Sequence, residues 1–308
     1  MPTNINEFEE DTAFERYILA RGFPLLPQPQ GGVVIDLGDI LSAAAQSTAI
    51  NVQVTAADSS RSPGDQFGIN EIRPLVFGAA WKVLDLLVEM RLEQDGVREP
   101  KRKNPGYSIA FKTKCVRTGK VSAPPPIQAD VWKRVMKCFD ATETLRHSVV
   151  HRRLTVDPST GDLCATSLPG EFAPKPLTIE EQSAFCRLAD GVAEAVIRGK
   201  LPNRTANILK WVLDQLAAHH KQPSFGTSRT DGLVPLVVVR PSPGPTNDLE
   251  LDFKHIRNRA RAAVKDVSYY DLEIHLPDNK VLAAPLEDTP DARVKLSVDN
   301  LPDWLRLV

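Results

Sequence analysis

The feature that most constrains the fold is an apolar stripe of helical period centred near residue 80. Apolar residues recur at steps of three and four from Ile72 to Met90, which places them on one face of a long helix. Pro74 suits the first turn of such a helix, and Gly96 suits its C-terminal end. An apolar helix face has to be covered by other elements, so this stripe predicts a helix within a bundle.

Three further segments carry the helical pattern. The second helix is predicted from about Ala129 to Arg152. The third opens at Thr178, where Glu181 completes a capping box, and it stops near Gly199. The fourth follows the short link at 199–202, which makes it an antiparallel neighbour of the third. Four helices with modest links predict a bundle over residues 70–221.

The two ends of the chain have a different pattern. Residues 1–69 are expected to be an N-terminal extension with a short helix and two short strands. Residues 230–308 are expected to be a small mixed module that contains a short basic helix at 253–264. Strand-like runs stand at 33–37, 50–54, 235–239, 269–276, 281–284 and 293–298. The predicted fold class is therefore α+β, with a helical bundle core, a short N-terminal segment and a small mixed α/β C-terminal module.

Composition limits the class of protein. A length of 308 residues suits one large domain or two ordinary ones, and 42% apolar residues can build a sizeable core. The formal net charge of -1 means that any nucleic-acid contact has to use local basic patches. A long apolar run, a signal peptide and a CxxC pair are missing from the sequence. We therefore expect a cytoplasmic protein without a membrane partner, a cofactor or a metal.

Arg146, His147 and His151 lie close together near the end of the second predicted helix. Arginine binds phosphate through a planar fork of donors, and histidine exchanges protons near neutrality because its ordinary pKa is ~6.5. RNA cleavage without a metal needs a base, an acid and a cation that stabilises the extra negative charge on phosphorus. These three residues are the predicted catalytic set.

Helical geometry favours a site shared between two copies of the chain. His147 and His151 are four residues apart and share one helix face. Arg146 and His151 are five apart, which rotates them by roughly 140° around the helix axis. A second copy of the segment across a two-fold axis would complete the site. The sequence therefore predicts a homodimer.

The order of these elements resembles the HEPN family. Arg146, a polar residue after it and then His151 are similar to that family's arginine–histidine signature, with His147 where asparagine is common. The long helix around 77–87, a basic insertion and a helix ending at 145–152 follow the family's order over about 70–220. The resemblance implies a dimeric helical bundle and a metal-independent endoribonuclease with a role as a toxin or in antiviral defence. It also implies an RNA substrate and an antitoxin or defence-system partner.

Basic residues suggest where RNA would bind. Residues 97–125 hold eight lysines and arginines against the single acid Glu99, with a strand expected at 108–111. This stretch is read as a solvated loop or hairpin, or as an arm that contacts phosphate. The residues expected to bind RNA are Lys101, Arg102, Lys103, Arg152 and Arg153.

Three other interpretations stay open. Arg146 and the histidines suit a solvated helix end that complements the helix dipole. His147 and His151 also have the spacing of a zinc-binding pair, but Ser148 follows where a zinc protease has its glutamate. The alternative function is a catalytically inactive HEPN-like module for dimerisation, binding or regulation.

Overall fold

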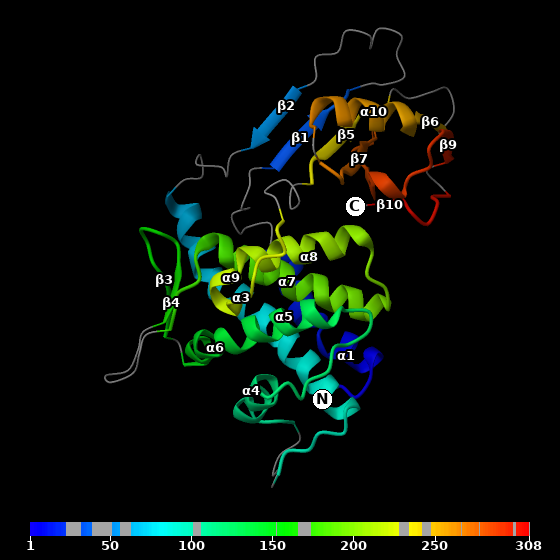
Figure 1. The fold of residues 1–308 in the computed structure, drawn as a ribbon. Helices are drawn as coiled ribbons and strands as arrows, with labels where there is room; N and C mark the ends of the chain where they lie inside the picture. The colour runs from blue at the N-terminus through cyan, green and yellow to red at the C-terminus, as the bar shows by residue number, and fades with distance from the viewer. Residues whose placement is uncertain are drawn as a thin grey trace. The chain divides into compact units, whose positions relative to one another are not determined.

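The computed structural model shows a mixed α/β protein with a large helical part. It describes residues 1–22, 32–38, 51–55, 63–100, 106–151, 153–165, 174–227, 234–241, 248–265, 267–276, 278–297 and 300–307. The chain forms two compact units (Figure 1). Unit 1 comprises Met1–Pro29 and Ser60–Ser228, and unit 2 comprises Gln30–Ser59 and Arg229–Val308. The segment at 1–69, expected to be one N-terminal extension, is thus divided between both units.

In the residues that the structure describes, the regular elements of unit 1 are helices and one hairpin. Its helices are α1 (Ile5–Asp11), α2 (Ala13–Gly22), α3 (Pro63–Gln94), α4 (Ile109–Arg117), α5 (Ala129–Ala141), α6 (Glu143–Val150), α7 (Ile179–Arg198), α8 (Asn203–Gln215) and α9 (Ala217–His220). The hairpin pairs β3 (Leu154–Val156) with β4 (Leu163–Ala165) in antiparallel fashion.

Helix α3 is the centre of unit 1. It packs against α1, α2, α6, α7 and β3. Residues 83–90 are all buried, so this stretch of the helix is covered on every side, as the middle of a central helix has to be. Trp81, Leu84 and Leu87 are fully buried on it. The predicted apolar stripe therefore forms part of the core, and Gly96, with a φ of +67°, follows the end of the helix as expected.

The start of α3 differs from the prediction. The helix begins at Pro63, so Pro74 lies inside it and not in its first turn. Pro63 occupies the position where the missing N–H of proline has no cost. An interior proline removes one backbone hydrogen bond of the helix. The prediction that Pro74 starts the helix was wrong.

The basic stretch after α3 contains a helix where a strand was expected. Ser108 is the N-cap of α4, and its side chain accepts a hydrogen bond from the N–H of Phe111 at 3.2 Å. Lys112, in the middle of this helix, is only 2% exposed. Its Nζ lies 2.9 Å from Oε1 of Glu89 and also pairs with Asp85, both on α3. Lys112 is therefore an internal link between α3 and α4 and cannot belong to a solvated arm.

The second predicted helix is divided in two. Thr142 ends α5 and precedes α6, and Figure 1 shows α6 following α5 end to end. The Thr142 hydroxyl donates to the carbonyl oxygen of Cys138 at 2.8 Å, a contact that bends helices. The apolar face nevertheless runs through the break. Its buried members are Val131, Val135, Cys138, Thr142 and Leu145.

The predictions for α7 are confirmed at both ends. Thr178 accepts from the N–H of Glu181, and the Glu181 carboxylate accepts from the N–H of Thr178. Gly199 adopts the left-handed conformation, with a φ of +62°, that ends the helix. Helix α8 follows after the short link and packs on α7.

Unit 2 is built on a six-stranded mixed sheet. Its strands are β1 (Gly32–Asp36), β2 (Asn51–Thr55), β5 (Leu236–Val239), β7 (Asp271–His275), β8 (Val281–Pro285) and β10 (Arg306–Leu307), in the order β10-β8-β7-β5-β1-β2. Strands β1, β5 and β7 are parallel, and β2, β8 and β10 are antiparallel to their neighbours. A second sheet pairs β6 (Asp248–Asp252) with β9 (Arg293–Ser297).

Helix α10 (Phe253–Ala263) belongs to the core of unit 2. Alternate residues of β7, Leu272 and Ile274, are fully buried together with Phe253 and Ile256 of α10. The period of two matches the alternation of side chains on a strand. The predicted strands and the predicted basic helix of this region are confirmed, and η4 (Leu286–Asp288) adds one short 3-10 turn.

Candidate functional site

His147 and His151 form a pair on the surface of α6. Their ring centroids are 4.9 Å apart, with the rings tilted by 56°. Both residues are exposed. His151 is the C-cap of the helix, and its backbone N–H donates to the carbonyl oxygen of His147 at 3.2 Å. Two imidazoles that can exchange protons therefore stand side by side at a solvent-facing helix end.

Packing on α3 determines which face of α6 reaches solvent. Leu145 is fully buried, and Val149 packs closely enough on Gly78 that a β-carbon at residue 78 would lie 3.5 Å from it. The Ser148 hydroxyl donates to the carbonyl oxygen of Thr144 at 2.9 Å, within the helix. The histidines occupy the opposite face, because residues four apart share a helix face.

Arg146 points to the buried side. Its guanidinium carbon lies 5.1 Å from the ring centroid of Trp81, and Trp81 is fully buried on α3. The Trp81 ring also stacks on Phe139 with centroids 4.3 Å apart. Among the described residues, no hydrogen bond or ion pair joins Arg146 to either histidine. Within one subunit the three predicted catalytic residues are thus not one cluster: the histidines pair, and the arginine stacks on the core.

The other predicted RNA-binding residues fall mostly outside the described residues. These are Lys101, Arg102, Lys103 and Arg152. Arg153 is described and exposed, and its backbone N–H donates to the carbonyl oxygen of Ser148 at 2.8 Å. One cation of the expected set therefore follows directly after the histidine pair.

Histidines 219 and 220 are buried and have structural roles. Nε2 of His219 lies 3.1 Å from the Glu181 carboxylate, close but not aligned as a hydrogen bond. In His220, Nδ1 accepts the N–H of Gln222 at 3.0 Å, so Nε2 carries the proton and donates to the carbonyl oxygen of Leu213 at 2.8 Å. Burial lowers the pKa of His220. This favours its neutral form, so it fastens α9 to α8 and is no proton carrier for an external substrate.

Cysteines offer no reactive thiolate at this site. All four are unpaired, and three of them are buried. Burial raises the pKa of Cys186 to about 12 and raises the pKa of the thiols of Cys115, Cys138 and Cys164 as well. In the described parts of the chain, no three or more histidine, cysteine or acidic side chains are grouped as a metal would require.

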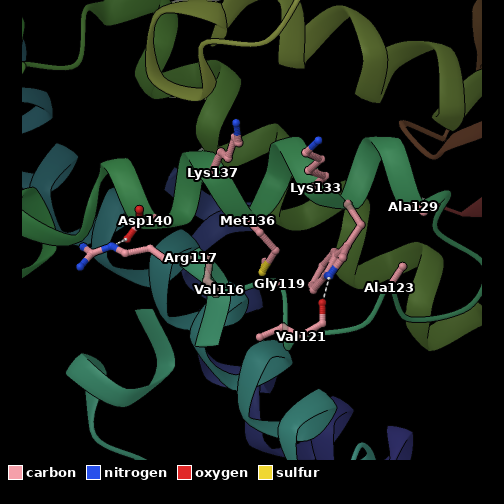
Figure 2. A pocket seen from close by; sticks show the side chains of 11 residues that line it. Val116, Arg117, Gly119, Val121, Ala123, Ala129, Lys133, Met136, Lys137 and Asp140 are labelled. Atoms are coloured by element: carbon pink, nitrogen blue, oxygen red, sulfur yellow. Dashed lines mark hydrogen bonds and ion pairs between the residues drawn. The ribbon is translucent and has the colours of Figure 1, made fainter. Parts of the chain in front are cut away.

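A cavity of about 510 Å³ lies beside α5 and was not anticipated (Figure 2). Its apolar lining comes from Val116, Val121, Ala123, Trp132 and Met136. In Figure 2, Lys133 and Lys137 extend from the side of α5 that faces away from the apolar lining, and Arg117 approaches Asp140 at one end. No short pattern in the sequence signals this cavity, because its lining joins residues of α4, of the following loop and of α5.

Much of the charge at this cavity is positive. Nε of Arg117 lies 2.8 Å from the carboxylate of Asp140, and another guanidinium nitrogen lies 3.2 Å from the carboxylate of Glu143. The two acids nearby are thus both paired with Arg117. Lys133 and Lys137 have no hydrogen-bond or ion-pair partner in the described part of the structure. Because the ammonium groups of both lysines point away from the apolar lining in Figure 2, the cavity itself offers a mainly apolar surface.

One of the basic residues of helix α10 makes structural contacts within unit 2. Arg257 pairs with Asp291 at 2.8 Å and also donates to the carbonyl oxygens of Leu286 and Thr289. These contacts fasten α10 to the turn after β8. The positive charge of Arg257 therefore stabilises the fold of unit 2.

No family model matches this chain, and no curated protein or solved structure matches it significantly. None of the helices in the described ranges is both long enough and apolar enough to cross a membrane.

Proposed function

We propose that the protein is a metal-independent endoribonuclease of the HEPN type that acts in the cytoplasm as a homodimer. The observation that carries the proposal is the exposed histidine pair on α6, with ring centroids 4.9 Å apart. Imidazole is the side-chain group that most often gives and takes protons in general acid–base catalysis. Such a pair supplies both proton-transfer groups that RNA cleavage requires.

The proposed reaction is internal transfer at a phosphodiester. One imidazole takes the proton of the ribose 2′-hydroxyl, and the resulting oxygen attacks the adjacent phosphorus. The bond from phosphorus to the 5′ oxygen breaks, and the second imidazole, in its protonated form, gives that oxygen its proton. The products are a 2′,3′-cyclic phosphate and a 5′-hydroxyl. His151 is assigned the main proton transfer, and His147 the complementary one.

The reaction also needs a cation at the phosphate. Arg146 stacks on Trp81 of its own subunit, so the charge has to come either from release of this stack or from a second copy of α6. Arg153, exposed just beyond the pair, is a further source. A cation that is positioned for the transition state stabilises the charge that develops there. A dimer in which two α6 ends meet fits this requirement best.

The arrangement of Arg146 favours one alternative. A guanidinium held against a buried tryptophan stabilises the helix and does so without any substrate. Under this alternative the protein is a catalytically inactive HEPN-like module that dimerises, binds a partner or regulates. The role as a toxin or antiviral effector with an antitoxin or defence partner is also proposed, on the resemblance of the motif.

The test is cleavage of total and transfer RNA by purified protein in the presence of a chelator. His147→Ala and His151→Ala should each lower the rate by about 10²-fold or more, with 2′,3′-cyclic phosphate ends on the wild-type products. His255→Ala, which removes an exposed histidine of unit 2, is the matched control and should leave the rate unchanged. Products with 5′-phosphate ends, or full activity in His151→Ala, would refute the proposal. A dimer that binds RNA but never cleaves it would favour the inactive module.

A further inference from the structure

Helix α2 carries two exposed aromatic rings on the surface of unit 1. Phe14 is 68% exposed and Tyr17 is 57% exposed. The guanidinium carbon of Arg21 lies 5.7 Å from the centroid of the Tyr17 ring. Contiguous exposed apolar groups mark interaction sites, and tyrosine and arginine are enriched among the residues that supply most of the binding energy of interfaces. The two rings and the arginine therefore form a candidate contact surface.

The opposite face of α2 holds the helix to the rest of unit 1. Leu19 is buried, and Gly22 lies so close to α3 that a β-carbon there would overlap the Val76 side chain. On another side, the Arg16 guanidinium pairs with Glu194 of α7 at 2.8 Å. These contacts fix which side of α2 faces outward.

The outward side continues from α2 back onto α1. The helical hydrogen bonds run through Thr12, which joins the two helices. Four exposed residues follow one another on this side at steps of four, three and four: Glu10, Phe14, Tyr17 and Arg21. At about 100° of rotation per residue, these steps keep all four within a strip roughly 60° wide. We call these four residues the α2 strip.

The α2 strip has opposite charges at its two ends. Glu10 is at one end, Arg21 is at the other, and the two rings lie between them. The two charged residues are about 16 Å apart along the helix axis, so they cannot pair with each other. Within the described ranges, neither side chain makes a hydrogen bond or an ion pair. The strip therefore complements a second α2 strip that runs in the opposite direction.

We propose that two copies of the chain bind each other through their α2 strips, antiparallel around a two-fold axis. Glu10 of each copy then faces Arg21 of the other, and Phe14 of each copy faces Tyr17 of the other. A two-fold contact uses the same patch on both subunits, so each of these pairs occurs twice. Carboxylate and guanidinium form charge-assisted hydrogen bonds, and aromatic rings attract each other in offset or edge-to-face arrangements.

The charge around the strip favours a second copy over RNA as the occupant. Exposed aromatic rings can stack on unpaired bases. However, the four acidic residues of α1 are all exposed: Glu7, Glu9, Glu10 and Asp11. Protein contacts with nucleic acid rely on cations that neutralise phosphates, and these carboxylates would repel them. A second α2 strip instead brings one arginine to each Glu10.

This contact is separate from the α6 contact of the proposed function and does not depend on it. A chain with two different two-fold contacts can form assemblies larger than a dimer. The experiment below uses no RNA substrate, so its result is independent of whether the protein cleaves RNA. Loss of the α2 contact would leave any association through α6 in place.

Charge reversal tests the pairing of Glu10 with Arg21. Sedimentation velocity over a range of concentrations measures self-association of the full-length wild type, Glu10→Arg and Arg21→Glu. Each single variant places like charges opposite each other twice and should weaken the association at least about tenfold. In an equimolar mixture of the two variants, unlike charges face each other at both ends, so association should return. Glu10→Arg/Arg21→Glu in one chain should also associate with itself.

Two further variants complete the experiment. Phe14→Ala removes a ring from both halves of the contact and should weaken association at least about tenfold. Lys200→Glu reverses an exposed charge elsewhere in unit 1 and should match the wild type. A wild type that associates no more strongly than Arg21→Glu would overturn the inference, as would a mixture of the two single variants that stays apart. Association that requires added RNA would also overturn it.

Discussion

Lys112 and Lys114 illustrate how differently two like residues on one short helix can be used. Both belong to a strongly basic stretch, and both lie on α4. Lys112 is buried against Asp85 and Glu89, whereas Lys114 is exposed. A buried ammonium is tolerable only when its charge is paired. Lys112 therefore contributes to the packing of α4 against α3, whereas Lys114 contributes only to the charge of the surface.

Replacing Lys112 by methionine should destabilise the protein by about 3–5 kcal/mol, because two carboxylates would stay buried without their cation. The midpoint of urea unfolding measures this change. Lys114→Met is the control and should change the free energy of unfolding by less than about 0.5 kcal/mol. Adding Asp85→Asn and Glu89→Gln to Lys112→Met should restore part of the loss. Equal midpoints for the two methionine variants would contradict the buried pairing.

Arg146 and the two histidines near it, His147 and His151, differ in a similar way in how far they are exposed. The residues adjoin in sequence, but Arg146 lies over Trp81 while His147 and His151 are exposed. The spacing predicted that the two histidines share a face and that the arginine does not join them on it. The contact with Trp81 was not predictable, because the partner stands on another helix, 65 positions earlier in the chain.

At the scale of elements, helix ends were easier to predict than helix breaks. Both ends of α7 follow from local signals, the capping box at Thr178 and the glycine at 199. The division between α5 and α6 carries no such signal. It falls at Thr142, which is fully buried and bonds the carbonyl oxygen of Cys138. Threonine can do this in many helices without breaking them, so its presence alone does not locate a break.

Thr178→Ala should lower the free energy of unfolding by about 1 kcal/mol, because the N–H of Glu181 loses its acceptor at the start of α7. Thermal or urea unfolding measures the loss. Thr178→Ser keeps a hydroxyl at the cap and should cost only a few tenths of that amount. An alanine variant as stable as the serine variant would mean that the capping box contributes nothing to the fold.

At the scale of the whole molecule, the N-terminal part of the chain contributes to both units. Helices α1 and α2 pack on α3 and α7 in unit 1. Strands β1 and β2 join the sheet of unit 2, where β1 lies beside β5 from the far end of the sequence. The strand pattern at 33–37 predicted β1 itself. It did not predict the partner, because pairing depends on contacts about 200 residues away.

Two core substitutions near the N-terminus should therefore affect different units. Phe8→Ala should cost about 3–5 kcal/mol and Ile35→Ala about 2–5 kcal/mol, since both side chains are fully buried. Hydrogen exchange followed by mass spectrometry locates the effect. Phe8→Ala should speed exchange in α3 and α7, and Ile35→Ala should speed it in β5 and β7. Faster exchange in α3 but not in β5 for Ile35→Ala would refute the division into units.

The candidate site was predictable only in part. His147 and His151 were expected to share a face, and their rings are neighbours. The cavity beside α5 was not expected, because its lining joins residues of α4, of the following loop and of α5. Of the residues predicted to bind RNA, only Arg153 lies within the described ranges, so that prediction stays open for the other four.

The sequence by itself determined much of the local structure: the apolar period of α3, α5, α7 and α8, the cap of α7, and the strands β1, β2, β5, β7, β8 and β9. Each of these local features depends on contacts between residues within one or two turns of each other, so a short stretch of sequence is enough to predict it. Tertiary structure decided the burial of Lys112, the stacking of Arg146, the place of β1 in the sheet and the cavity beside α5. Each of these depends on which surfaces meet after folding, and packing between distant segments is not encoded in any short pattern.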